Sequence, residues 1–402
     1  MWVLRECGFS ALLLTYYKKL FMTTKSPTFF SRFSFFKKNA ALQNRIVHRW
    51  LAIIITLPMI FILITGIFLQ VRKPVDWIQP PAMKGSEKYQ PTIALEQVLT
   101  EIKTIPEMQV DNWSDIKLLD LRPKKGIIKV RNHNELETQV DATTGEILQV
   151  AQRRNDFITK MHDFSAWHAR LWLGLPVRIG FLVLFLTGVY LNIKMLPAHL
   201  KAIHFWRMLT RKTDPSASLK DTSTAQDADV SSQDKTTNED GRPLRLRKKS
   251  WLLKYHYWLG WIVIIPWAFV ITSGLLLQVR YEVPWVMPVQ QQGQGTVPEI
   301  EFVQVLETAR QLPEYDVQEW KDVWRIYVYP NKGITTVRAK NRQELQIDSS
   351  TGEVLQVAIR RLDWLENIHE GKWMGLNLWL FLPVHILSLI LWLTGTIVAF
   401  SR

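Results

Sequence analysis

Histidine is the residue type whose placement says most about chemistry in this chain of 402 residues. A neutral imidazole is a common metal ligand, and its charge changes near physiological pH. Four of the nine histidines form two matched pairs at the ends of long apolar stretches, His48 with His256 and His162 with His369. The single cysteine, Cys7, excludes internal disulfides and cysteine-ligated iron–sulfur clusters. Any metal must therefore be bound by histidine, methionine or carboxylate.

Long apolar stretches must position these histidines. Between Arg49 and Arg72 the chain runs 22 residues without a formal charge, which is enough for a helix to cross a hydrocarbon core of about 30 Å. Three further stretches qualify, one interrupted only by Arg178 and another containing His385. The sequence therefore predicts four membrane-spanning helices, over 45–72, 161–194, 251–280 and 368–402.

The chain is a tandem repeat of one unit. HRWLAIIITLPMIFILITGIFLQVR from His48 matches HYWLGWIVIIPWAFVITSGLLLQVR from His256, and DATTGEILQVAQRR from Asp141 matches DSSTGEVLQVAIRR from Asp348. Because each unit has an even number of spans, both copies enter the membrane from the same side, and we expect an axis along the membrane normal to relate them. Matching histidines would then face each other across that axis.

Each repeat also contains a polar insert, over 73–160 and 281–367. The insert begins with a helical pattern, from Thr92 in the first copy and from Ile300 in the second. Alternating strands follow, and the last two flank a Thr-Gly turn. The predicted fold class is thus an α-helical membrane protein with α+β inserts, each one helix against a small antiparallel sheet.

The formal net charge of +14 is explained by membrane topology rather than by a nucleic-acid partner. Basic residues flank the first helix and the segment between the second and third helices. The positive-inside rule therefore predicts that 1–44, 195–250 and the C-terminus are cytoplasmic and that both inserts lie on the opposite side. We expect 1–44 to be a retained basic leader that begins at Met1 or Met22, and 195–250 to be a disordered linker.

Together these motifs carry a resemblance to a known family. The two D-x-x-TGE-(I/V)-LQV inserts, bracketed by H-(R/Y)-WL helices and by later helices ending in LTG, make the chain from Gln43 to Arg402 resemble the PepSY-associated transmembrane family. Members of similar size are similar to bacterial inner-membrane haem proteins that reduce ferric siderophores at the periplasmic face. The resemblance implies two b-type haems, a ferric chelate as acceptor in addition to the lipid bilayer, and a donor that is either a quinol or a cytoplasmic reductase.

The resemblance and the repeat axis together suggest haem ligands. His48 and His256 would hold one iron near the cytoplasmic face, and His162 and His369 would hold another near the outer face. A histidine at a membrane interface is also often only an anchor or a partner of a backbone carbonyl. A purely structural role for these four histidines is therefore the alternative to haem ligation.

Three more residues leave the ligand pairing open. His385 lies inside the fourth span, and its position in the repeat corresponds to Arg178. Ionisable residues inside spans usually face the bundle interior, where His385 could ligate a haem and Arg178 could pair with a propionate. His168 is a further candidate on the outer side, and Gly375 occupies the matching position.

Small residues recur in all four predicted helices, and they permit either close packing of helices or room for a macrocycle: Thr65-Gly66, Thr187-Gly188, Ser273-Gly274 and Thr394-Gly395.

Three functions compete on sequence alone. The leading one is electron transfer to ferric chelates, and the second is a non-enzymatic regulator or sensor of the PepSY type. A transporter with duplicated halves ranks last, because the spans offer few polar residues beyond Arg178 and His385. Motifs of serine hydrolases, zinc proteases and nucleotide-binding proteins do not occur.

Overall fold

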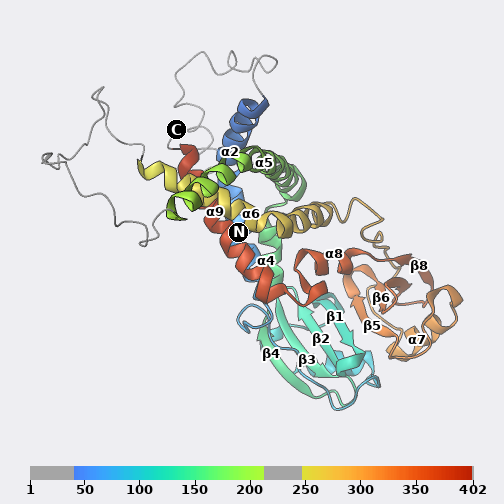
Figure 1. Cartoon of the computed structure of the whole chain (residues 1–402). Helices are drawn as coiled ribbons and strands as arrows, with labels where there is room; N and C mark the ends of the chain where they lie inside the picture. The colour runs from blue at the N-terminus through green and yellow to red at the C-terminus, as the bar shows by residue number, and fades with distance from the viewer. Residues whose placement is uncertain (1–39, 212–246, 401–402) are drawn as a thin grey trace, which may run out of the picture. The chain divides into compact units, whose positions relative to one another are not determined.

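The computed structural model describes residues 40–211 and 247–400 (Figure 1). The expected leader before residue 40 and the expected linker between 212 and 246 lie outside the described residues. The chain divides into two compact units, one comprising Met1–Trp50 and Thr187–Lys220 and the other comprising Leu51–Leu186 and Asp221–Arg402.

Four helices are long and apolar enough to cross a membrane, which confirms the predicted class of membrane protein. They are α2 (Ala40–Gln70), α5 (Leu175–Arg211), α6 (Arg247–Gln278) and α9 (Leu382–Phe400). A π-helical turn precedes α5 at Arg170–Gly174 and α9 at Asn377–Phe381. Within the second unit, all four helices contribute to one apolar core that includes Met59, Phe181, Trp267 and Trp392.

His162 and His369, the pair predicted near the outer face, lie on short helices of their own, α4 (Asn155–His162) and α8 (Leu362–His369). The predicted spans 161–194 and 368–402 instead placed His162 and His369 at the beginnings of the second and fourth membrane helices. The helices end because Phe164 and Gly371, which match each other in the repeat, both adopt a left-handed backbone conformation with φ of 64° and 70°. His162 and His369 thus stand at helix ends, each before a loop that leads into a span.

Both inserts are one helix against an antiparallel sheet, as predicted. In the first insert, α3 (Leu95–Lys103) precedes β1 (Ile116–Arg122), β2 (Ile127–Asn132), β3 (Leu136–Asp141) and β4 (Ile147–Gln152). In the second, α7 (Phe302–Arg310) precedes β5 (Val323–Tyr329), β6 (Ile334–Ala339), β7 (Gln343–Asp348) and β8 (Val354–Ile359).

The two inserts share a single sheet, which the sequence did not indicate. The strand order is β4-β3-β2-β1-β5-β6-β7-β8, and Figure 1 shows the first four strands in cyan and the last four in orange. At the junction β1 and β5 run antiparallel, with Asp120 opposite Tyr327. Because β1 and β5 pair with each other, neither strand is left as a sheet edge with unpaired backbone N–H and C=O groups.

The sheet has one apolar and one polar face. Apolar residues of α3 and α7, among them Val98 and Val305, pack with Leu119 and Val328 in a common core. Because side chains alternate along a strand, Asp120 and Arg122 project from the other face of β1, as Tyr327 and Tyr329 do from β5. This polar face contributes to the cavity described next.

Candidate functional site

A cavity of about 1180 Å³ lies within the second unit. Its lining comes from the parts of the spans nearest the inserts, from α4 and α8, and from the polar face of the sheet. Three of the candidate histidines, His162, His369 and His385, line it together with Arg178. The fold therefore connects His162 and His369 to the polar face of the inserts through one cavity.

His162 and His369 are brought together as the repeat predicted. Their ring centres are 6.5 Å apart, and the ring planes are inclined by 63°. The two residues come from α4 and α8, which occupy equivalent positions in the two repeats. Two imidazoles from matching positions thus meet in one cavity.

Hydrogen bonds show which nitrogen of His162 carries the proton. Its Nδ1 is 3.0 Å from the Thr65 hydroxyl, which has backbone carbonyls of Phe61 and Ile62 at 2.8 and 3.1 Å. A hydroxyl has one proton to donate. Because that proton goes to a carbonyl, the Thr65 oxygen accepts from Nδ1–H, and Nε2 of His162 keeps its lone pair.

His369 reaches the same state through matching partners. Its Nδ1 lies 3.0 Å from the Val270 carbonyl and 3.1 Å from the Ser273 hydroxyl. A carbonyl oxygen only accepts, so Nδ1 must donate. Among the described residues, Nε2 of His162 and Nε2 of His369 have no hydrogen-bond partner. Each ring therefore keeps a basic Nε2, and the hydrogen bonds at Nδ1 fix the orientation of the ring.

The recurrent glycines provide the space for these rings. A Cβ atom on Gly66 would lie 3.4 Å from Cε1 of His162, and one on Gly274 would lie 3.0 Å from Cε1 of His369. The hydroxyl residue before each glycine makes the hydrogen bond. At Thr65-Gly66 and Ser273-Gly274 the hydroxyl residue binds the imidazole ring and the glycine leaves space for it; we call such a pair an imidazole seat. This role is more specific than the close helix packing or the space for a macrocycle that the sequence suggested.

Glycines also lie beside His48 and His256, the pair predicted near the cytoplasmic face, and Thr187 provides the matching hydroxyl for His48. His48 Nδ1 lies 3.0 Å from the Thr187 hydroxyl, and a Cβ on Gly188 would lie 3.2 Å from its Cε1. His256 Nδ1 donates to the Leu391 carbonyl at 3.2 Å, and a Cβ on Gly395 would lie 2.7 Å from its Cε1. His48 belongs to the first unit and His256 to the second, so their pairing on one iron stays a prediction.

Each histidine-bearing loop is fixed by the other repeat. Gln278, at the end of α6, donates to the carbonyls of Asp163 and Arg170, and Arg280 binds the Asp163 carboxylate at 2.9 Å. Gln70 and Arg72 make the matching contacts to Glu370 and Asn377, with an ion pair of 2.7 Å between Arg72 and Glu370.

Sequence reasoning missed these four positioning residues. The signal was present in the LQVR motif that ends the first span of each repeat, but the motif served only to detect the duplication. The contacts cross between repeats, so they also keep α4 and α8 at a fixed separation.

The surroundings of His162 and His369 favour the neutral form of both rings. Burial, reinforced by Arg178 and the neighbouring histidines, holds the pKa of His162 well below its usual range. Burial and the nearby His385 likewise lower the pKa of His369 to about 4. The neutral imidazole is the form that binds metal.

These residues fit a haem. A metal–imidazole bond of about 2 Å places two ring centres on opposite sides of one iron about 6 Å apart, close to the observed 6.5 Å. Among the described residues, no group of three or more His, Cys, Asp and Glu is arranged to hold a metal ion. A haem iron needs only two protein ligands, because the macrocycle supplies the others.

The remaining candidates occupy different environments. His385 donates from Nδ1 to the Phe381 carbonyl at 2.6 Å and lines the same cavity. Arg178 donates to the carbonyls of His162 and Gly174 and forms no ion pair with the described residues, so its charge remains available to an anion. His168 is exposed in a loop and does not belong to the cavity lining.

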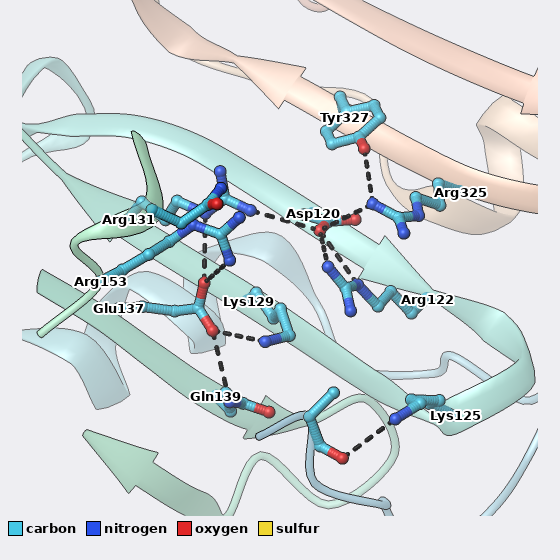
Figure 2. A network of polar contacts seen from close by, with 12 residues as sticks. Asp120, Arg122, Lys125, Lys129, Arg131, Glu137, Gln139, Arg153, Arg325 and Tyr327 are labelled. Atoms are coloured by element: carbon cyan, nitrogen blue, oxygen red, sulfur yellow. Dashed lines mark hydrogen bonds and ion pairs between the residues drawn. The ribbon is translucent and has the colours of Figure 1, made fainter. Parts of the chain in front are cut away.

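A charged network lies on the polar face of the sheet, and two of its members, Arg122 and Arg325, line the cavity. Figure 2 shows guanidinium groups of Arg122, Arg131 and Arg325 around the Asp120 carboxylate, at 2.7, 3.6 and 3.7 Å. Burial alone would raise the pKa of Asp120, but these three cations outweigh it and lower the pKa to about 2. The fully buried Asp120 carboxylate thus interacts with three guanidinium groups, one of which, that of Arg325, comes from the other repeat.

This network predicts a pH-dependent stability. The folded pKa of Asp120 lies below its ordinary value of 3.8, so its stabilisation is present above about pH 4 and is lost as the pH falls towards 2. The difference corresponds to about 2 kcal/mol. We expect Asp120→Asn to lower the free energy of unfolding of the sheet at about pH 6, with a gap to the wild type that shrinks between about pH 4 and 2.

Thermal unfolding of the detergent-solubilised chain, followed by circular dichroism across this pH range, measures the gap. Asp111→Asn, at an exposed position of the same insert, is the control. A gap independent of pH would show that the Asp120 charge is not what stabilises the sheet.

Four spans with two helix–sheet inserts define a duplicated, polytopic membrane protein. Residues 45–402 match the PepSY-associated TM region, and the chain belongs to this family. The resemblance seen in the sequence is thereby confirmed. A comparison with curated proteins finds no match.

Proposed function

We propose that this protein is a b-type haem protein of the bacterial inner membrane that passes electrons to ferric siderophores or other ferric chelates at its periplasmic face. His162 and His369 would hold one haem, and His48 and His256 would supply ligands for a second haem nearer the cytoplasm. Reduction weakens the hold of the chelate on iron, so the product is ferrous iron released for uptake.

One observation carries this proposal. Two neutral imidazoles, each with a basic nitrogen and each fixed through Nδ1, lie 6.5 Å apart in a cavity that extends to the inserts. A structural histidine needs neither a repeat-matched seat nor a neighbour at this distance. The combination is typical of a pair of axial ligands.

Each element of the site has a distinct task. A haem with two imidazole ligands supplies one-electron transfer without an open coordination position. Thr65 and Ser273 hold the ligand nitrogens in the required tautomer, while Gln70 and Gln278 keep the two histidine loops in register. Phe181 and Trp267, in contact at 4.4 Å between ring centres, close the apolar side of the cavity. Arg178 offers a cation to a haem propionate.

The inserts bind the electron acceptor and carry out no chemistry of their own. Their polar face borders the same cavity as His162 and His369, so a chelate bound there would lie beside the outer haem. Electrons would enter from the cytoplasmic side by way of the inner haem, with a quinol or a cytoplasmic reductase as donor.

Anaerobic reoxidation tests the proposal directly. The purified protein is reduced with dithionite, freed of the reductant, and mixed with a ferric chelate. We expect its haem bands to return to the oxidised form while a ferrous-specific chelator reports iron release in the same proportion. Haem that stays reduced would argue against ferric-chelate reduction, and a protein purified without haem would favour the PepSY-type regulator.

The proposed direction of transfer requires a particular topology. We expect alkaline phosphatase fused near Gly126 or Gly333, in the turns after β1 and β5, to be active because these turns face the periplasm. A fusion in the linker near Gln233 should be inactive. The reverse pattern would invert the protein in the membrane and contradict delivery of electrons to periplasmic iron.

A further inference from the structure

The cavity has two chemically different walls on the sheet. A cationic wall is formed by Lys117, Arg122 and Lys125 of the first insert, and an aromatic wall by Trp324, Tyr327 and Tyr329 of the second. Figure 2 shows Arg122 at the end of β1, Lys125 in the turn that follows it, and Tyr327 on the neighbouring strand of the other repeat. The walls meet where β1 pairs with β5.

The difference arises at matching positions of the repeat. Lys117 corresponds to Trp324 and Arg122 to Tyr329, both at an offset of 207. By contrast, positions that hold the sheet together have kept their chemistry. Glu137 binds Arg153 at 3.0 Å in the first insert, and their counterparts Glu344 and Arg360 pair at 3.1 Å in the second. The duplicated scaffold is therefore preserved, while two of the three positions of the cationic wall are aromatic in the second repeat; the third, Lys125, is matched by Lys332.

The cavity as a whole is strongly cationic. Its described lining contains thirteen Lys and Arg but only five Asp and Glu. In the cationic wall, Lys125 donates to the Ala82 carbonyl, and Lys117 reaches Asp156 only at 4.0 Å. Burial and neighbouring cations, Arg122 first among them, lower the pKa of Lys125. This wall carries positive charge in excess of its own counterions and favours an anionic ligand.

The aromatic wall offers flat apolar surface beside that charge. Trp324 supplies most of the exposed ring surface, at 39% exposure, whereas Tyr329 is half-buried and Tyr327 is buried. The rings of Tyr327 and Tyr329 are stacked with centres 6.1 Å apart, and Arg338 lies over the Tyr327 ring at 4.2 Å. Arg325 lies over the Trp324 ring at 4.6 Å. Exposed aromatic rings are sites for stacking against other aromatic groups.

We infer that the cavity selects ferric chelates that are anionic and coordinate iron through aromatic groups of the catecholate type, in preference to neutral hydroxamate chelates. This inference rests on the proposed function, since it names the class of acceptor for the same site. The cationic wall binds the negative charge of the chelate, and the aromatic wall packs against its rings.

Gallium(III) complexes separate binding from electron transfer, because gallium(III) has the charge of ferric iron and is not reduced. Three probes are titrated into the full chain in zwitterionic nanodiscs by calorimetry: trianionic, aromatic gallium tris-catecholate; trianionic, non-aromatic gallium tris-oxalate; and neutral gallium tris-acetohydroxamate. We expect affinity to fall in that order, with at least about a tenfold difference between the first and the last.

Variants assign the preference to each wall. The double variant Lys117→Gln/Lys125→Gln should weaken binding of both anions by about tenfold and leave the hydroxamate complex unchanged. Lys124→Gln removes one charge from the same turn at an exposed position outside the lining and serves as the control. Trp324→Lys introduces the residue found at the matching position and should abolish the preference for catecholate over oxalate.

These binding experiments test the selectivity of the cavity separately from the proposed reduction of the chelate. Equal affinity for the hydroxamate and the anions, or unchanged anion binding in the double variant, would overturn the inference. A retained catecholate preference in Trp324→Lys would remove the role of the aromatic wall. Because none of these readouts needs haem reduction, selective binding without chelate reduction would refute the proposed function and leave the inference on selectivity standing.

Discussion

Alanine at His162 or at His369 is expected to remove the outer haem completely and to leave the inner one in place. The haem-to-protein ratio should fall by about half, since each variant deprives one iron of an axial ligand. Both rings line the same cavity with their centres 6.5 Å apart. Pyridine haemochrome quantification on purified protein measures the loss.

The double variant should lose no more haem than either single variant. Two residues that act on one shared partner give non-additive effects, whereas residues of separate sites give additive ones. His168→Gly is the matched control, because His168 has a left-handed backbone with φ of 53° and its repeat counterpart is Gly375. We expect it to retain full haem content.

Two other outcomes would change the ligand assignment. If His385→Ala removes the outer haem while His162→Ala retains it, the site is built on His385 and Arg178 rather than on the symmetric pair. The same single and double comparison at His48 and His256 tests the inner haem, where additive losses would separate these two residues.

Gly274→Val should empty the outer site although every histidine remains. A Cβ at this position already lies 3.0 Å from Cε1 and 3.4 Å from Nδ1 of His369, so the branched side chain occupies the space of the imidazole. Displacement of the ring also breaks its hydrogen bond to Ser273. We expect haem loss comparable to that of His369→Ala, measured by the same assay.

Two control variants distinguish steric exclusion of the His369 ring from a general loss of folding. Thr272→Val alters the adjacent, exposed residue, whose hydroxyl bonds only within its own helix, and should keep its haem. Gly66→Ala places a methyl group 3.4 Å from His162, an ordinary contact, and should also be tolerated. Far-ultraviolet circular dichroism confirms that Gly274→Val is folded. Full haem occupancy in folded Gly274→Val would show that His369 does not need this seat.

Much of the architecture could be predicted from the sequence because its signals are local. A run of apolar residues such as the one after Arg49 is sufficient to indicate a span, and alternation before and after Thr144-Gly145 is sufficient to indicate paired strands. The duplication then placed His162 and His369 at equivalent positions. No distance information was needed for these steps.

The rest depends on contacts between segments distant in sequence. The junction of β1 and β5 joins Asp120 to Tyr327 across about half of the chain, and nothing in either strand distinguishes this edge from an exposed one. Likewise Gln278 acts on the loop after His162 in the other repeat. Such contacts follow from how the two copies face each other, which periodicity does not describe.

The broken helices before the second and fourth spans show a subtler limit. Phe164 is a residue type that rarely adopts a left-handed conformation, so the first repeat offered no local signal for a helix end. The second repeat did contain one, because Gly371 occupies the matching position. Comparison of the two copies at that position would have predicted the break.

The visible spectrum and haem content of the purified wild-type protein test the central claim most directly. Protein produced in haem-replete cells should contain two b-type haems per chain, with low-spin spectra and α bands that sharpen when dithionite is added. The same preparation of His162→Ala/His369→Ala should keep only one. A colourless wild-type protein, or a double variant with unchanged haem content, would contradict the assignment of His162 and His369 as axial ligands.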